Sequence, residues 1–180
     1  MPVKPLLSRE DWERFDSYAE LFAGETDRGA AVLAGSYLGS LLEDLLRAKL
    51  VPGDYLKSLF SDANGPLGTF YSRITLAYAL GLLPPEVQHD LHLVRKIRNK
   101  FAHHPEMMRF QTRPVSDWCR ELDTTRFVAR YFRDPAEAFA KNARGQFVLA
   151  VQIAMFQINR VKYDAEPFQP TRLEEGEGKS

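Results

Sequence analysis

Hydrophobic residues recur every three or four positions along most of this chain, the spacing of amphipathic α-helices that share a core. No segment alternates as a half-buried strand would. The spacing predicts helices over residues 9–23, 27–50, 55–60, 69–82, 85–103 and 135–163, with 115–122 as a further short candidate. We therefore expect an all-α protein, a compact helical bundle of about six helices.

The helix predicted over residues 27–50 differs from the others in the small size of its first half. Glycine, alanine and serine fill most positions from Gly29 to Ser40. Small side chains let neighbouring helices approach closely, so we expect this helix to lie at the centre of the bundle.

The domain organisation follows from where the helical pattern ends. One helical domain is expected over residues 8–163. Beyond it, two prolines and the acidic, glycine-rich run from Glu174 to Gly178 predict a disordered acidic tail over residues 164–180.

Composition excludes several classes of protein. The 180 residues carry 24 basic and 24 acidic side chains, a formal net charge of +0, which argues against a protein that coats nucleic acid. Cys119 is the only cysteine, so no internal disulfide can form, and it is expected to pack in the core with Trp118. No apolar run reaches the roughly 20 residues of a membrane span, and no signal-peptide pattern is present, so a cytoplasmic location is expected. We predict no metal site and no cofactor.

The segment from Asp90 to His104 carries the most candidate chemistry. Leu91, Val94, Ile97 and Phe101 form one apolar side of a helix, and Pro105 follows its end. The polar residues of this segment are therefore presented by a rigid element to a phosphate or a partner chain. They include Arg95, Arg98, Asn99, His103 and His104.

Three stretches together resemble the mannitol operon repressor family of bacterial regulators. They are Glu25 to Ala31, Asn64 to Gly68 with Ser72-Arg73, and Leu80 to Leu83 leading into Asp90 to His104. Their order and spacing agree over roughly residues 10–122. The resemblance implies a helical fold and a transcriptional regulator that works through protein partners without a typical DNA-reading motif of its own. Members of the family look degraded between Arg98 and His103, whereas this chain is intact there.

The pattern Arg98-Asn99-x-x-x-His103 is also similar to the signature of HEPN domains, many of which are ribonucleases. That resemblance implies a metal-independent ribonuclease, or its inactive relative, with the arginine and histidine brought together across a dimer interface. Arg98 would bind the scissile phosphate, His103 would act as general acid or base, and Asn99 would orient one of them. RNA is a partner only under this alternative, and the sequence does not establish that the chain is an enzyme.

The same motif also has structural and partner-binding interpretations. Arg98 could pair with Glu43 or Asp44, and the histidines could stabilise the negative end of the helix dipole. Alternatively, the motif could contact another regulator or a second copy of this chain in a homodimer. These alternatives remain open from the sequence.

A second group of candidate binding residues precedes this segment. Asp27, Arg28 and Arg73 could form one network with Glu43, either as structural ion pairs or as a small-ligand sensor, because a buried arginine needs a partner. The Asn64 to Gly68 stretch reads as a turn that starts a helix, with anion binding by its free amides as the alternative. The candidate binding residues are therefore Asp27, Arg28, Arg73, Arg95 and His104.

Overall fold

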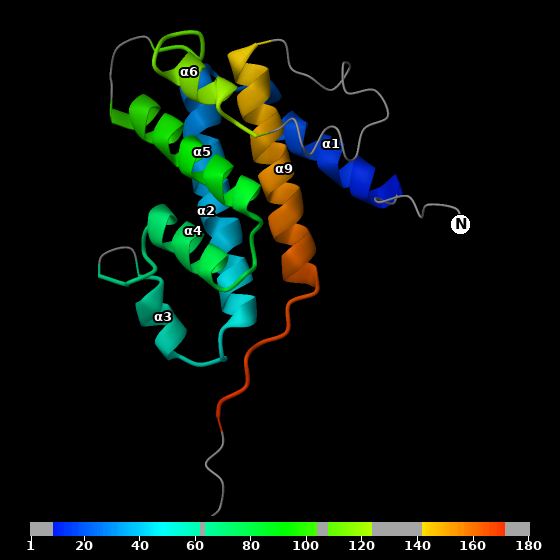
Figure 1. The fold of residues 1–180 in the computed structure, drawn as a ribbon, viewed down its shortest axis with the longest axis vertical. Coiled ribbons are helices and arrows are strands. Elements are labelled where there is room, and N and C mark those ends of the chain that lie inside the picture. The colour runs from blue at the N-terminus through cyan, green and yellow to red at the C-terminus, as the bar shows by residue number, and fades with distance from the viewer. Residues whose placement is uncertain (1–8, 62–63, 104–107, 124–141, 172–180) are drawn as a thin grey trace, which may run out of the picture.

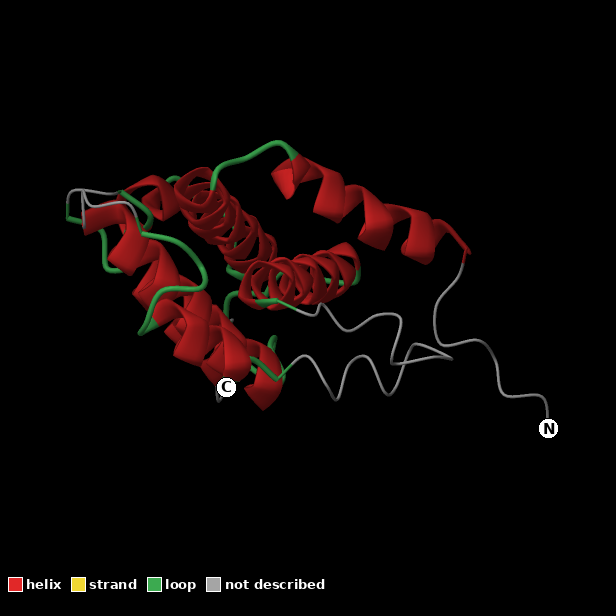
Figure 2. Cartoon of the chain, turned by 90° about the horizontal axis from the view of Figure 1, so that it is seen from above, coloured by secondary structure: helices red, strands yellow, loops and turns green. Residues whose placement is uncertain are grey.

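The structure, a computed structural model, describes residues 9–61, 64–103, 108–123 and 142–171 of the chain. These residues form seven helices and no strand (Figure 1, Figure 2). The helices are α1 (Arg9–Ala23), α2 (Asp27–Lys49), α3 (Tyr55–Leu59), α4 (Phe70–Ala79), α5 (Pro85–His103), α6 (Val115–Arg120) and α9 (Ala143–Tyr163). The predicted all-α class is confirmed. The start predicted for the last helix, near residue 135, lies outside the described residues.

Helix α2 is the centre of the bundle, as its small residues indicated. It contacts α4, α5 and α9, while α1 packs on the other side of α9 (Figure 1). Ala30, Ala31 and Ala34 are fully buried, which allows the neighbouring helices to approach the α2 backbone. Long helices thus meet along a surface of small side chains, and α5 is held directly against this central element.

Polar side chains fix the starts of three helices. The hydroxyl of Thr26 accepts a hydrogen bond from Gly29 N at 3.0 Å, and the hydroxyl of Thr69 accepts one from Ser72 N at 3.0 Å. Asn142 Oδ1 accepts from Gly145 N at 2.9 Å at the start of α9. Each bond satisfies an amide that has no partner within its own helix. Thr26 therefore caps α2, and the carboxylate of Asp27 is left for tertiary contacts.

Gly81 ends α4 because its backbone adopts a left-handed conformation, with φ of 71°. Its amide bonds Tyr78 O at 2.9 Å, and Leu82 N bonds Ala77 O at 3.0 Å. Glycine takes this conformation without the steric cost that a side chain would bring. The helix consequently stops before residue 82, where the apolar pattern alone predicted its end.

The core includes a chain of three aromatic rings that joins α5 to α9. The ring centroids of Phe101 and Phe110 lie 5.0 Å apart, and those of Phe110 and Phe147 lie 4.9 Å apart. All three side chains are fully buried. Cys119 is also buried, as expected, and burial raises the pKa of its thiol to about 12.

The first residues of the predicted tail make defined contacts with the end of α2. Phe168 N donates a hydrogen bond to Lys49 O at 2.8 Å, and Lys49 Nζ lies 4.9 Å from the centroid of the Phe168 ring. These contacts were not predicted from the polar composition of the segment. Residues 172–180, which include the acidic run, lie outside the described residues.

Candidate functional site on helix α5

The solvent side of α5 carries a row of basic and polar side chains, here called the basic face. It consists of His92, Arg95, Lys96, Asn99 and His103. Steps of three and four residues place these side chains on one side of a helix with about 3.6 residues per turn. Lys96 and His103 are exposed, and the other three are half-buried. The same helix buries Leu91, Val94, Ile97 and Phe101, whose packing sets the orientation of the basic face.

Aromatic side chains from two other helices hold the cations of the basic face in place. The Arg95 guanidinium lies 5.1 Å from the ring centroid of Tyr71 on α4, and Tyr71 also lies 5.5 Å from the His92 ring. Lys96 Nζ lies 4.3 Å from the ring of Trp118. A cation over an aromatic face is attracted by the ring yet keeps its charge. Arg95 Nε is buried and has no hydrogen-bond partner among the described residues.

No carboxylate of α5 belongs to the basic face. The only carboxylates on α5 are Glu86, in the first turn, and Asp90, which is buried at 4% exposure. Burial raises the pKa of Asp90, although the Asp123 amide and His89 act in the opposite direction. Burial, with the nearby charges of Arg95 and His89, lowers the pKa of His92. His92 is therefore neutral near pH 7, and Arg95 and Lys96 supply the charge.

Arg98 and His103 do not meet within one chain. Arg98 lies on the inner edge of α5 against Gly35 of α2, where an added Cβ would fall 2.7 Å from Arg98 Cγ. Its Nη1 donates to Asn99 Oδ1 at 2.9 Å. Five residues turn an α-helix by about 140° beyond a full turn, so exposed His103 faces another direction. The arrangement that the HEPN resemblance implies would need a second copy of the chain.

The partners suggested for Arg98 on α2 are engaged by other side chains. Glu43 pairs with Arg73 at 2.9 Å and with Arg47 at 2.8 Å. Asp44 pairs with Lys162 at 2.8 Å. The structure therefore gives Arg98 a neighbouring amide and a close backbone approach in place of the predicted carboxylate. His104 lies outside the described residues.

Arg73 is a buried arginine with internal partners. Its Nε donates to Leu67 O at 2.8 Å, its Nη1 donates to Gly39 O at 3.1 Å, and its Nη2 pairs with Glu43. These contacts tie α4 and the loop before it to α2. They support the structural interpretation of Arg73 over a ligand-binding one.

Asp27 belongs to a different cluster from Arg73. Arg144 Nη1 donates to Asp27 Oδ1 at 2.7 Å, and Phe110 N donates to Asp27 Oδ2 at 3.1 Å. Sixteen residues separate Asp27 from Glu43, about 24 Å along α2, so the single network predicted from the sequence is divided into two clusters. Arg28, next to Asp27, is exposed. Nothing in the sequence indicated Arg144 as the partner of Asp27.

The loop at Asn64 to Gly68 is a turn closed by its own backbone. Gly65 N donates to Ser61 O at 2.9 Å, and Gly68 N donates to Gly65 O at 2.9 Å. A Cβ at Gly65 or Gly68 would lie within 2.5 Å of a backbone oxygen, so both positions require glycine. Because these two amides are already bonded, the turn interpretation is favoured over the anion-binding alternative.

The comparisons with known proteins identify a family. The family model described as mannitol repressor matches residues 40–160, about two-thirds of the chain. The chain belongs to the mannitol repressor family. The predicted family is thereby confirmed, and the protein is a regulator of the mannitol repressor type. The matched region contains the second and third of the three sequence stretches, and Glu25 to Ala31 precedes it. No curated protein sequence matches the chain.

Two solved structures share the fold of this family member. One is the X-ray structure of the MtlR–HPr complex from Escherichia coli, 20% identical, with a TM-score of 0.62, covering 81% of this chain and 98% of that chain. The other is a possible transcriptional regulator, YggD, from Shigella flexneri 2a, 16% identical, with a TM-score of 0.52, covering 89% of this chain and 98% of that chain. At 20% and 16% sequence identity, the similarity to these two structures shows that this chain shares their fold.

The region matched by the mannitol repressor model includes the whole basic face together with Tyr71 and Trp118. Sequence reasoning did not single out Tyr71 and assigned Trp118 to the core. The signal in the sequence that could have indicated Tyr71 is its place, as an aromatic residue, on the polar side of the helix that contains Arg73. Among the described residues, no group of side chains could hold a metal ion. None of the described helices has the length and apolar character needed to cross a membrane.

Proposed function

We propose that this member of the mannitol repressor family regulates by docking a protein partner on the basic face of α5. The observation that carries the proposal is the arrangement of Arg95 and Lys96, each held over an aromatic ring on a helix side without an exposed carboxylate. A ring contact does not neutralise a cation, so both side chains keep their positive charge for a partner. The complementary surface on that partner is acidic.

The composition of the basic face suits a protein interface. Arginine, tyrosine and tryptophan are the residue types that contribute most binding energy at protein interfaces. The ring contacts restrict the two cationic side chains before binding, so less conformational entropy is lost when a partner docks. Opposite charge on the partner would speed the encounter and make association sensitive to salt.

The relative in the MtlR–HPr complex supplies a specific candidate for the partner. We infer that HPr, or a protein of the same kind, is the partner of this chain. The alternatives that the sequence left open, another regulator and a homodimer, use the same type of exposed contact. The proposed protein-mediated action also fits a chain with zero net charge and no typical DNA-reading motif.

The test is a calorimetric titration of the full chain with HPr at two salt concentrations. We expect binding that weakens as salt rises, and a loss of about tenfold or more in the double variant Arg95→Glu, Lys96→Glu, because charge pairs at an interface contribute on the order of 2 kcal/mol or more. Lys57→Glu is the matched control, since Lys57 is an exposed lysine on α3. Equal affinities for the double variant and the control would refute docking on this face.

A further inference from the structure

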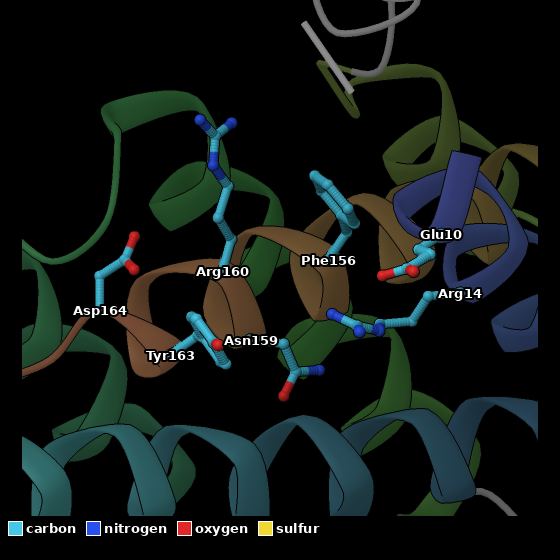
Figure 3. A pocket seen from close by; sticks show the side chains of 7 residues that line it. All are labelled: Glu10, Arg14, Phe156, Asn159, Arg160, Tyr163 and Asp164. Atoms are coloured by element: carbon cyan, nitrogen blue, oxygen red, sulfur yellow. The ribbon is translucent and has the colours of Figure 1, made fainter. Parts of the chain in front are cut away.

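A second candidate site lies in a polar groove between α1, α2 and α9, away from the basic face. Two adjoining cavities, of about 290 and 440 Å³, share Arg14, Asn159 and Tyr163 as lining residues. Figure 3 shows the side chains that line the smaller cavity. Their sizes fall in the range of pockets for small molecules, about 300 to 1,000 Å³ taken together. None of the basic-face residues lines this groove, so it is a separate feature of the protein.

Arg14 provides a cation directed into the groove. Its side chain extends from α1 toward Asn159 and Tyr163 on α9 (Figure 3). Glu10 lines the same cavity, but no ion pair joins it or any other described carboxylate to Arg14. A planar guanidinium with unused donors matches the oxygens of a phosphate or carboxylate.

Asn159 and Tyr18 provide hydrogen-bonding groups beside this cation. Asn159 Nδ2 donates to the Tyr18 hydroxyl at 3.0 Å and to Met155 O at 3.0 Å. The Tyr18 proton and the Asn159 Oδ1 have no partner among the described residues. Burial raises the pKa of Tyr18, although the Asn159 hydrogen bond and the charge of Arg14 act in the opposite direction. One directed donor and one directed acceptor thus remain for a ligand.

Two exposed tyrosines form the sides of the groove. Tyr37 of α2 is 40% exposed and Tyr163 of α9 is 90% exposed, and both line the larger cavity. Aromatic side walls with a few convergent polar groups are typical of sites for small polar ligands. Lys162, on the same side, is already paired with Asp44. Arg160 also lines the smaller cavity, but its side chain extends away from Asn159 and Tyr163 (Figure 3), so Arg14 is the cation that faces these two residues.

We propose that this groove binds a small polyhydroxylated anion, of the hexitol phosphate class. Arg14 holds the phosphate, while Tyr18 donates to one hydroxyl oxygen and Asn159 Oδ1 accepts from another. The combination of one cation with an adjacent donor and acceptor matches a ligand that carries a phosphate at one end and hydroxyls along its length. The proposal does not depend on partner docking at α5.

The first experiment is a calorimetric titration of the full chain with mannitol 1-phosphate, free mannitol and inorganic phosphate. We expect mannitol 1-phosphate to bind about tenfold or more tightly than either other probe, because only it engages both the cation and the hydroxyl-binding groups. No binding of mannitol 1-phosphate, or equal binding of inorganic phosphate, would overturn the proposal.

Variants test the assigned roles. Arg14→Gln should weaken binding about 10- to 100-fold, and Tyr18→Phe, which keeps the ring, about 2- to 10-fold. Arg9→Gln is the matched control, since Arg9 is an arginine of the same helix that pairs with Glu13 on its surface. Circular dichroism of each variant confirms that the fold is retained. Equal affinities for Arg14→Gln and Arg9→Gln would overturn the assignment.

Discussion

Arg73 and Arg95 lie on neighbouring helices and differ in how the rest of the fold contacts their guanidinium groups. Arg73, 9% exposed in its side chain, has its donors engaged by two backbone carbonyls and Glu43. Arg95 lies over the Tyr71 ring and keeps a buried Nε without a hydrogen-bond partner among the described residues. The first arrangement satisfies the charge inside the fold, whereas in the second an aromatic ring holds the guanidinium and no described carboxylate pairs with it. The same residue type thus stabilises one region and equips the other for binding.

The largest expected effect is a difference in the free energy of unfolding between the alanine variants of these two arginines. Arg73→Ala should lower the free energy of unfolding by about 2 to 4 kcal/mol, because it removes the buried partner of Glu43 and leaves Leu67 O and Gly39 O without their donor, although Glu43 keeps Arg47. Arg95→Ala should lower it by less than about 1 kcal/mol, because only a half-exposed ring contact is lost. Urea unfolding followed by circular dichroism measures both. Similar losses in the two variants would show that the contrast is wrong.

A smaller effect is expected at the other internal cluster. Asp27→Ala removes acceptors for Arg144 and for Phe110 N, which should cost about 1 to 3 kcal/mol of unfolding free energy. Arg144→Ala should cost a similar amount, since Arg144 also donates to Phe22 O and Glu25 O. The double variant should lose less than the sum of the two single losses. Strict additivity in urea unfolding would argue that the two side chains do not interact.

The smallest expected effect concerns the buried carboxyl beneath the basic face. The pKa of Asp90 is raised above 3.8 in the folded chain, mainly by burial. The folded state therefore binds this proton more tightly, so the contribution of Asp90 to stability is lost as the pH rises through the folded pKa. Asp90→Asn cannot ionise and keeps an oxygen to accept from Asp123 N, so it should lose less stability than the wild type between about pH 4 and 7.

Urea unfolding of Asp90→Asn and the wild type over that pH range is the measurement. All other groups titrate in both proteins, so the difference between the two curves isolates residue 90. Parallel curves would show that the raised pKa does not contribute to stability, and a larger loss in Asp90→Asn would mean that the ionised carboxylate stabilises the fold.

Much of the fold could be predicted because its signals are local. Apolar residues repeat at helical spacing, and Pro85, His103 and Pro105 mark the two ends of α5. The small residues of α2 predicted its central position, since a close helix approach requires them. Boundaries were less accurate where tertiary or cap geometry decides them, as at Gly81, where a left-handed residue ends α4 before the apolar pattern does.

The candidate site was predictable only in part, because its partners come from elsewhere in the chain. The basic residues of α5 stand out in the sequence, but Tyr71 and Trp118 lie beside them only after α4 and α6 pack on the bundle. The link between Asp27 and Arg144 spans 117 residues, a distance over which no periodicity gives information. The predicted network of Asp27, Arg28, Glu43 and Arg73 did not account for the separation of Asp27 from Glu43 along α2.

The most direct test of docking on α5 is to map the surface of the isotopically labelled chain that changes in nuclear magnetic resonance spectra when HPr is added. The account predicts that the largest shifts occur at the amides of Arg95, Lys96 and Asn99 and at the indole of Trp118, and that they diminish as salt is raised. Shifts confined to α1 and α9, with α5 and Trp118 unchanged, would contradict it.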